Sequence, residues 1–478
     1  MRATILGLAA LALASSAAAQ QQPAAPAPAV APAPPPTASV SPQVQRTLDQ
    51  LRDAGLRDDH GFDIVRDLVT QVGPRISGSD QEARARDWAA AMLRANGFTN
   101  VHIETFLVPG WHWDRQEASI VSPSHQRLVV AALGGSPSTP SGGVEAEIVR
   151  FPDLLSLQGA PDAAVRGKIV FIDERMPRTQ DASGYGMAVQ KRGGCPRLAA
   201  PKGALACMIR SVGTDTHRFA HQGSAGRNVA IPIASMSPAD ANTLTTLLQH
   251  NPVRVHLEIE ASFRENGQSG NVIGDIRGRE RPDEIVVLAA HLDSWDLGQG
   301  AIDDGSGVAI VTAAARLINA LPRHPRRTIR LLLAGSEEPG GYGGDAYAKA
   351  HAGEHHVLAA ESDLGADRVY RFNSGFSDAA MPYARAFQRA LAPLGVVPGG
   401  NDADGGTDIG GLKMNGTPVV DLQQDASRYF DFHHTADDTL AAIDPDQLRQ
   451  NVAAYAVFAY MAAESDWTFG SGAPAAQH

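Results

Sequence analysis

The feature that most constrains the fold is a series of short apolar runs, each followed by acidic or histidine side chains. The runs and the polar residues after them are 284–290 with His291 and Asp293, 327–334 with Glu337 and Glu338, and 355–360 with Glu361 and Asp363. Short apolar runs of this kind indicate buried strands. Because helical patterns alternate with them, the sequence predicts an α/β fold with a central sheet and helices on both faces.

Two more polar segments accompany these runs. Asp303 and Asp304 stand in a glycine-flanked loop at 300–307, just before an apolar helix expected at 308–317, and residues 433–439 read HHTADDT. In α/β sheets ligands gather outside the carboxyl ends of strands, so these side chains are expected to meet there. Histidine and carboxylate groups bind zinc, and a two-metal site with a free carboxylate as base fits this set.

Each segment alone also has a plain structural explanation, such as a core histidine, a helix cap or a surface acid. Five of them at successive strand ends, in one half of the chain, do not share such an explanation. Alternate residues of an extended segment lie on one side, so His291 can bind metal while Asp293 accepts its other ring N–H. Adjacent Glu337 and Glu338 cannot bind one ion in the same way, which suggests one ligand and one base. Asp363 follows another acid, and two acids repel each other unless a cation is present.

Bulk properties exclude some partners. The formal net charge of the 478 residues is −11, whereas nucleic-acid binding needs a basic face. Arg2, an apolar run at 5–14 and a small-residue site at 17–19 indicate a signal peptide. No other run is long and apolar enough to anchor the chain in a membrane. The mature protein is therefore expected in the periplasm or outside the cell.

The pattern of predicted helices and strands changes along the chain. Residues 79–96 predict a helix capped by Ser79, with Glu82 three positions on, followed by a strand at 101–108. From 116 to 262, short β-type runs and one helix near 189–200 suggest an inserted β-rich domain without candidate ligands. The expected division is signal peptide (1–19), Pro/Ala-rich tether (20–41), N-terminal part of the catalytic domain (42–115), inserted domain (116–262), main catalytic domain (263–468) and loose tail (469–478).

The two cysteines, Cys195 and Cys207, lie within the expected insertion. In an oxidising compartment they could pair. Two buried free thiols fit the sequence equally well, so the sequence leaves the pairing open.

The motifs resemble a known family. HLDSWDLGQGAIDDGSG (291–307), the glutamate pair, ESDLG (361–365), GGTDIGGL (405–412) and FHHTADDT (432–439) are similar to the dinuclear zinc exopeptidases of the aminopeptidase Y and bacterial leucyl aminopeptidase type. Within that family they most resemble the carboxypeptidase Q group. GKIVFID, GALACMIRSV and IPIASMS, at 167–173, 203–212 and 231–237, resemble the protease-associated domain that such enzymes carry.

The resemblance implies a ligand set for two zinc ions. The implied ligands are His291 and Asp363 for one ion, Glu338 and His434 for the other, and Asp303 as the bridge between both. The family spacing H-x-x-x-D-T matches His434 with Asp438 and so favours His434 over His433.

The remaining roles also follow from the resemblance. Glu337 matches the general base, which takes the proton of the attacking water and passes it to the leaving amine. Asp293 matches the acid behind His291. The family further implies a cis peptide between Asp303 and Asp304.

The expected activity is hydrolysis of short peptides from a free terminus, most of all dipeptides, with a broad aminopeptidase acting on longer peptides as the alternative. Asp408 is a candidate wall of the substrate site, although it could equally cap a turn. Arg368 and Arg428 are candidates for a substrate carboxylate. A homodimer is implied by the resemblance alone. A one-zinc glutaminyl cyclase and a non-catalytic binding protein are rival readings, and the two-metal ligand pattern speaks against both.

Overall fold

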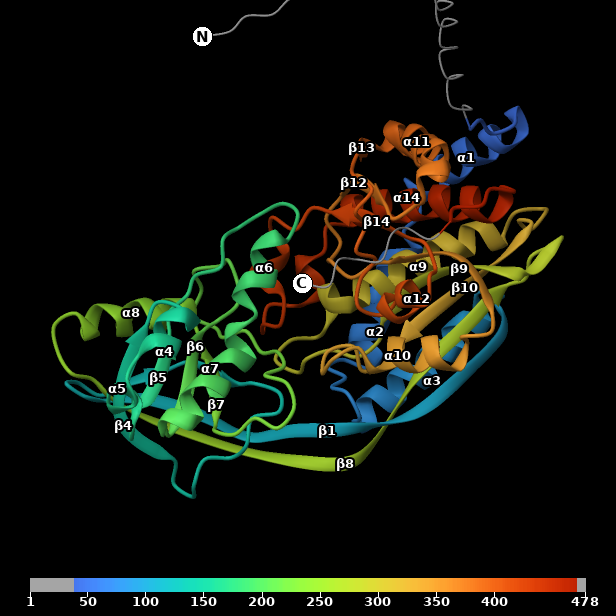
Figure 1. Ribbon diagram of the computed structural model, residues 1–478. Helices are drawn as coiled ribbons and strands as arrows, with labels where there is room; N and C mark the ends of the chain where they lie inside the picture. The colour runs from blue at the N-terminus through green and yellow to red at the C-terminus, as the bar shows by residue number, and fades with distance from the viewer. Residues whose placement is uncertain (1–37, 471–478) are drawn as a thin grey trace, which may run out of the picture. The chain divides into compact units, whose positions relative to one another are not determined.

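The structure, a computed structural model, describes residues 38–470 (Figure 1). The predicted signal peptide at 1–19 and nearly all of the predicted tether at 20–41 lie outside the described residues. Among the described helices, none is both long and apolar enough to cross a bilayer.

A mixed sheet forms the core of the part that carries the candidate ligands. Its central strands β9, β10, β11 and β14 run parallel, while β12 and β8 join them antiparallel. The strands are β8 (Arg254–Ile276), β9 (Arg281–His291), β10 (Arg327–Ala334), β11 (His355–Glu361), β12 (Val369–Ser374), β13 (Val397–Pro398) and β14 (Val419–Gln424). The predicted strands at 284–290, 327–334 and 355–360 are thereby confirmed.

Helices cover both faces of this sheet, which confirms the predicted α/β architecture. In β9, Val286 and Leu288 pack into the larger core cluster, whereas Ile285 and Val287 pack into a smaller one on the opposite face. The larger cluster holds α1 (Pro42–Gly55), α2 (His60–Gln71), α3 (Asp80–Ala95), α9 (Ser306–Asn319), α11 (Met381–Leu391) and α14 (Pro445–Glu464). The smaller cluster holds α10 (Tyr342–Ala350) and α12 (Gly410–Met414). Burial on both faces explains why these strands are continuous apolar runs.

Residues 116–262 contain a second group of strands. Strands β4 to β7 are parallel neighbours, and β3 lies antiparallel to β7. They are β3 (Val130–Ala132), β4 (Val144–Phe151), β5 (Ile169–Ile172), β6 (Ala206–Arg210) and β7 (Ile233–Met236). The strands predicted here are confirmed.

The expectation of a single helix in this segment is wrong. The helices observed are α4 (Leu154–Gly159), α5 (Asp162–Val165), α6 (Ser183–Ala188), α7 (Lys191–Ala199) and α8 (Pro238–Leu248). Parallel strands need crossover connections, which are usually helical. Most of these helices are too short to show a periodic apolar pattern, which is why the sequence did not reveal them.

A long antiparallel ribbon links the two groups of strands. β1 (Thr99–Ser122) pairs with β8 along nearly its whole length, and β8 also pairs with β10 at one end and β4 at the other. In Figure 1 the two strands run together from the β4–β7 side to the β9–β10 side. The predicted strand at 101–108 is only the first part of β1, because Pro109 and Gly110 interrupt the alternating pattern there.

Two local features bear on the sequence predictions. The Ser79 hydroxyl accepts a hydrogen bond from the Glu82 N–H at 3.1 Å, which confirms the predicted cap of α3. Cys195 of α7 and Cys207 of β6 form a disulfide with Cα atoms 6.3 Å apart. The structure thus resolves the pairing that the sequence left open.

Candidate metal centre

The candidate ligands come from five separate segments that meet at the carboxyl edge of the main sheet. His291 ends β9, Asp303 lies in the loop before α9, and Glu338 and Asp363 follow β10 and β11. His434 follows α13 (Tyr429–Phe432). Three parallel strands therefore end side by side and deliver these residues to one place, as the sequence predicted.

The distances divide these side chains into two groups that share Asp303. His291 Nε2 lies 3.1 Å from Asp303 Oδ1 and 3.4 Å from Asp363 Oδ1. His434 Nε2 lies 3.0 Å from Asp303 Oδ2 and 3.0 Å from Glu338 Oε2. Each oxygen of the Asp303 carboxylate thus faces a different histidine, which is the arrangement that a carboxylate bridging two ions requires.

Several buried oxygens of this cluster lack hydrogen-bond donors. Among the described residues, Asp303 Oδ2, Glu338 Oε1 and Asp363 Oδ1 are buried without a hydrogen-bond partner. Buried polar atoms are nearly always satisfied, so each exception needs a cause. Bound cations would supply the missing partners and offset the crowding of acids.

The histidine rings are oriented so that Nε2 is free for a metal. His291 Nδ1 lies 3.0 Å from the carbonyl oxygen of Asp293, and His434 Nδ1 lies 3.2 Å from that of Gln222. A ring that donates from Nδ1 to a carbonyl carries its lone pair on Nε2. Second contacts of this type fix the tautomer of metal-binding histidines.

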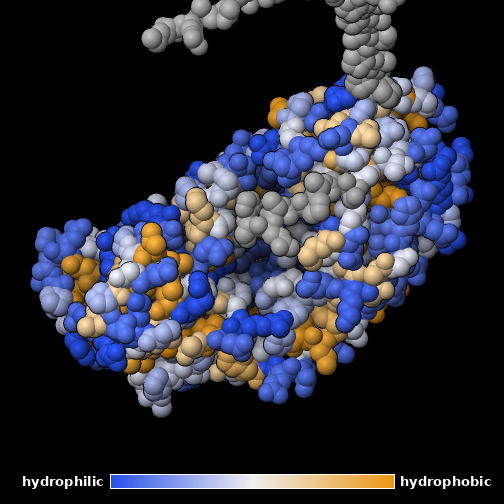
Figure 2. Space-filling view, in the orientation of Figure 1, coloured by the Kyte–Doolittle hydropathy of each residue, from blue (hydrophilic) through white to orange (hydrophobic). Residues whose placement is uncertain are grey.

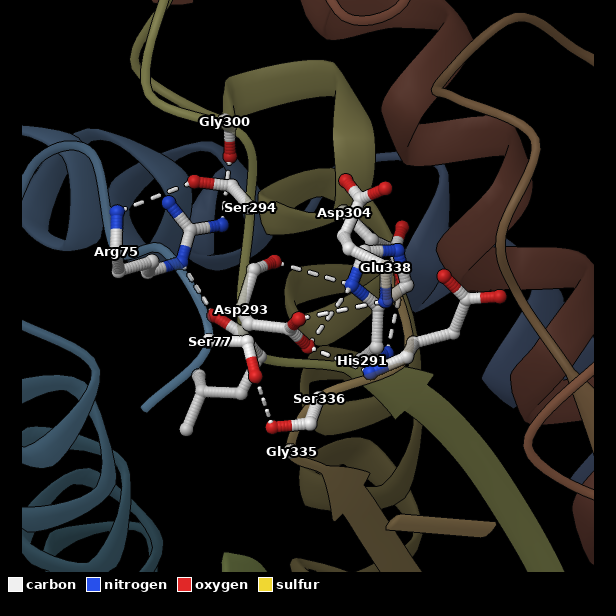
Figure 3. Close-up of polar contacts among 12 residues, drawn as sticks. Arg75, Ser77, His291, Asp293, Ser294, Gly300, Asp304, Gly335, Ser336 and Glu338 are labelled. Atoms are coloured by element: carbon white, nitrogen blue, oxygen red, sulfur yellow. Dashed lines mark hydrogen bonds and ion pairs between the residues drawn. The ribbon is translucent and has the colours of Figure 1, made fainter. Parts of the chain in front are cut away.

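The predicted role of the Asp293 carboxylate needs correction. Its Oδ1 is 3.7 Å from His291 Nδ1, too long for a hydrogen bond, and the backbone carbonyl takes that place. The carboxylate instead accepts the backbone N–H groups of Glu337 at 2.9 Å and Glu338 at 3.3 Å (Figure 3). Asp293 therefore holds the loop that carries the predicted base and one predicted ligand.

The choice between the two adjacent histidines is informed by distance. The rings of His433 and His434 are stacked with centroids 3.5 Å apart. His433 Nε2 is 3.6 Å from Asp303 Oδ2, farther than that of His434, and only His434 forms an ion pair with Glu338 among the described residues. This geometry favours His434 as the ligand.

The loop before α9 is fixed by its own backbone contacts. The peptide between Asp303 and Asp304 is cis, as the resemblance implied. Asp304 accepts the N–H groups of His291 at 3.1 Å and Gly307 at 2.9 Å. An added Cβ at Gly307 would lie 2.0 Å from the Ser362 carbonyl oxygen, so only glycine permits this packing.

Arg75 is a buried residue of this region that sequence reasoning missed. Its guanidinium donates to the carbonyl oxygens of Leu292, Gln299 and Gly300, all in the loop between β9 and Asp303 (Figure 3 shows the Gly300 side). Burial lowers the pKa of Arg75 below its usual range. The only available signal was an arginine beside Pro74 and Gly73, which does not distinguish a buried residue from a turn residue.

The predicted base and the candidate substrate residue lie among further acids. Burial raises the pKa of Glu337 well above its usual range, and the nearby carboxylates of Asp363 and Glu338 act in the same direction. Asp408 is fully buried, and its backbone N–H donates to Glu361 Oε2 at 2.8 Å. Burial raises the pKa of Asp408 to about 8. Its carboxylate has no hydrogen bond among the described residues, so the turn-capping alternative has no contact to support it.

Residues 116–262 supply no candidate ligand, yet they reach the centre. The Gln222 N–H donates to the His434 carbonyl oxygen at 2.9 Å, and Arg192 lies 3.4 Å from His434 Nδ1. The Tyr185 ring of α6 meets the His433 ring edge-on at 5.4 Å. Figure 2 shows the surface hollowed between the segments that carry α6 and α10. Sequence reasoning missed these residues because they lie in a segment without ligand motifs.

Comparison with known proteins gives the family. The profile of Peptidase family M28 matches residues 271–459. Rat carboxypeptidase Q is 34% identical over 408 residues, 84% of each chain. The crystal structure of a peptidase M28 precursor from Shewanella amazonensis is 45% identical, has a TM-score of 0.88, and covers 90% of this chain and 99% of its own. A zinc aminopeptidase of Bacillus subtilis, 19% identical with a TM-score of 0.65, shares the fold over 87% of this chain and 98% of its own.

The fold and the clustered histidine and carboxylate groups define a metal-dependent hydrolase with an α/β core. The chain belongs to peptidase family M28 and is a metallopeptidase. Family membership and the candidate cluster together imply a dinuclear zinc site.

Proposed function

We propose that this protein is a dinuclear zinc exopeptidase that hydrolyses short peptides, free dipeptides above all, in the periplasm or outside the cell. The position of Asp303 between two histidine–acid groups carries this proposal. The motif resemblance to the carboxypeptidase Q group implies short peptides, and similarity to an aminopeptidase of Bacillus subtilis supports a broader aminopeptidase as the alternative.

The proposed ligand set uses the whole cluster. One zinc ion would be held by His291 and Asp363, the other by Glu338 and His434, with Asp303 as the bridge. Zinc ions held by these residues would supply Lewis acidity for the scissile carbonyl and would activate water as the nucleophile. The unsatisfied buried oxygens of Asp303, Glu338 and Asp363 support this assignment.

We assign proton transfer to Glu337. Asp293 accepts its backbone N–H at 2.9 Å and so fixes the start of the loop beside the ligands. A carboxylate held beside the ligands could take a proton from the attacking water and return it to the leaving amine.

Glu337→Gln tests the base. The variant should bind as much zinc as the wild type but lose about 10²–10⁴-fold in kcat. Glu265→Gln, at an exposed position of β8, is the matched control and should leave kcat unchanged. Activity of Glu337→Gln within a few-fold of the wild type would show that another group is the base.

Histidine variants test the ligand choice. His434→Ala should lower bound zinc strongly, because it removes the ring facing both Asp303 and Glu338. His433→Ala should lower it much less. The reverse order, measured by metal analysis of purified protein, would assign the ligand to His433.

Residues 116–262 are proposed to form a protease-associated-like insertion that borders the site and limits peptide length. Support comes from the contacts of Gln222 and Arg192 with His434. The value of kcat/KM should then fall steeply from dipeptides to tetrapeptides. Equal values for both lengths would contradict a length limit.

We also propose that the protein is exported and that it forms a homodimer. The proposed signal peptide predicts a mature chain that begins at Gln20, which N-terminal sequencing of protein from whole cells would test. A mature chain that retains the first residues would refute it. The proposed homodimer is tested by sedimentation.

A further inference from the structure

An apolar cavity of about 280 Å³ lies beside the candidate ligand Glu338. Its walls come from four parts of the chain: the segment between α2 and α3, the β1–β8 ribbon, the loops of the 116–262 segment, and the residues after β9 and β10. The lining includes the side chains of Trp111, Arg227, Phe263, Trp295 and Tyr342. Apart from Glu338, its lining residues have no role in the proposed zinc binding or proton transfer.

Trp295 connects the wall of this cavity with the metal centre. Its ring packs edge-on against Trp111, with centroids 6.3 Å apart, and against His434, with centroids 6.0 Å apart. A Cβ added at Gly134 would lie 2.4 Å from the Trp295 ring, and one at Gly135 would lie 2.2 Å from the Gly226 carbonyl oxygen. Because these loops approach each other so closely, their packing fixes the shape of the cavity.

The size and lining suit one side chain. A volume of about 280 Å³ lies just below the range of ligand pockets, which run from roughly 300 to 1,000 Å³. Aromatic walls favour an apolar or aromatic group, because edge-on and stacked ring pairs add to the burial of area. The location beside Glu338 places such a group next to the bond that the centre would cleave.

Arg227 adds a cation to this cavity. Its guanidinium carbon lies 4.6 Å from the centroid of the Tyr342 ring, and the side chain is exposed. Among the described residues it forms no ion pair, whereas Arg428, a candidate from the sequence, is held by two hydrogen bonds to Asp367. Arg227 is therefore available for an anion, and an exposed arginine binds a carboxylate through two parallel hydrogen bonds.

Electrostatics favours a cation at this position. Glu337, Glu338, Asp303 and Asp363 crowd the adjacent centre. Two bound zinc ions would balance the charge of these four carboxylates but would be occupied by them and by the scissile group, so a free substrate carboxylate needs a partner of its own. Arg227 supplies one at the wall of the cavity that would hold the same residue's side chain.

We propose that this cavity receives the side chain of the C-terminal residue of the peptide, and that Arg227 binds the free carboxylate of that residue. The inference rests on the proposed function and names its preferred substrates: peptides, dipeptides first, that end in an aromatic or large aliphatic residue. Trp111, Trp295 and Tyr342 set the preference for the side chain, and Arg227 sets the requirement for a free carboxylate.

The test measures kcat/KM of the zinc-loaded protein for Ala-Gly, Ala-Leu, Ala-Phe, Phe-Ala and Ala-Phe amide. The wild type should prefer Ala-Phe to Ala-Gly by at least about tenfold, as expected when a buried apolar group is added. Trp111→Ala should lower kcat/KM for Ala-Phe more than for Ala-Gly and so reduce this ratio toward one. Phe263→Ala, at a half-exposed wall position, should reduce it less and serves if Trp111→Ala fails to fold.

Arg227→Met tests the carboxylate. It should lower kcat/KM for Ala-Phe by about tenfold or more and lower that for Ala-Phe amide by much less, because the amide carries no charge to bind. Arg227→Lys should recover part of the loss. Arg197→Met, an exposed arginine of α7, is the control and should change neither substrate.

Different outcomes would overturn the proposed substrate preference and the proposed exopeptidase activity. Equal rates for Ala-Gly and Ala-Phe, a preference seen only at the first residue, or equal losses for free and amidated Ala-Phe would overturn the inference while peptide hydrolysis stands. Absence of hydrolysis of every peptide would overturn both.

Discussion

Replacing Arg75 with methionine removes a fully buried guanidinium from the loop that leads to Asp303. Three carbonyl oxygens of that loop lose their donor, and two of them, those of Leu292 and Gly300, belong to buried residues. A buried group left unsatisfied costs about 1–3 kcal/mol, so the two together cost about 2–6 kcal/mol. Methionine also removes a charge whose burial is unfavourable, as the lowered pKa of Arg75 shows. The expected net loss of unfolding free energy is therefore in the lower half of this range, about 2–4 kcal/mol.

The assay is urea unfolding of metal-free and zinc-loaded protein, with zinc affinity measured on the same samples. We expect Arg75→Met to lower the free energy of unfolding by the amount above and to weaken zinc binding by about tenfold or more, as for other residues that orient ligands. Arg75→Lys should not restore either property, because one ammonium group cannot reach carbonyls in several directions. Arg84→Met is the control, since the exposed Arg84 side chain donates only one hydrogen bond within residues 38–470, to the Gln71 carbonyl oxygen. A change within about 0.5 kcal/mol for Arg75→Met, with unchanged zinc affinity, would refute the reasoning.

Three further predictions concern stability. Burial lowers the pKa of Lys191 to about 7, so between that pH and its unfolded pKa near 10.4 the unfolded chain binds a proton that the folded chain has lost. Through this residue, the free energy of unfolding should therefore increase as pH rises from about 7 to 10. Urea unfolding at several pH values should show a smaller increase with pH for Lys191→Met than for the wild type. Replacing Cys195 and Cys207 together with alanine should cost about 3 kcal/mol in the same assay under oxidising conditions, and reductant should weaken the wild type but not the double variant. Ser79→Ala should cost about 1 kcal/mol by removing the cap of α3, and an unchanged midpoint would speak against the cap.

Much of the main sheet was predictable because local pattern and burial agree there. The strand at 327–334 was found with its bounds, since every residue of β10 is buried and the run ends in glycine. The candidate ligands were predictable for a related reason: His291, Glu338 and Asp363 lie at or within four residues of the ends of parallel strands, which topology brings together.

Other parts of the site depend on contacts between distant segments, which sequence pattern does not encode. Gln222 contacts His434 and Arg227 lines the cavity beside Glu338, and both belong to the 116–262 segment, which the β1–β8 ribbon links to the main sheet. Arg75 acts through carbonyl oxygens, which any residue type offers. The Asp293 carboxylate was predicted to contact His291, but two backbone N–H groups compete for it and a carbonyl oxygen takes its place. The spacing correctly predicted that Asp293 lies near His291. It could not predict which group the Asp293 carboxylate would contact.

The central claim is a two-zinc exopeptidase, and one titration tests it most directly. Zinc would be added stepwise to metal-free mature protein while hydrolysis of free Ala-Phe is followed, with N-acetylated Ala-Phe as the blocked control. The account predicts that activity rises until about two zinc ions are bound per chain and that the blocked peptide is not cleaved. Full activity with one zinc ion bound, or no hydrolysis of the free peptide with two bound, would contradict it.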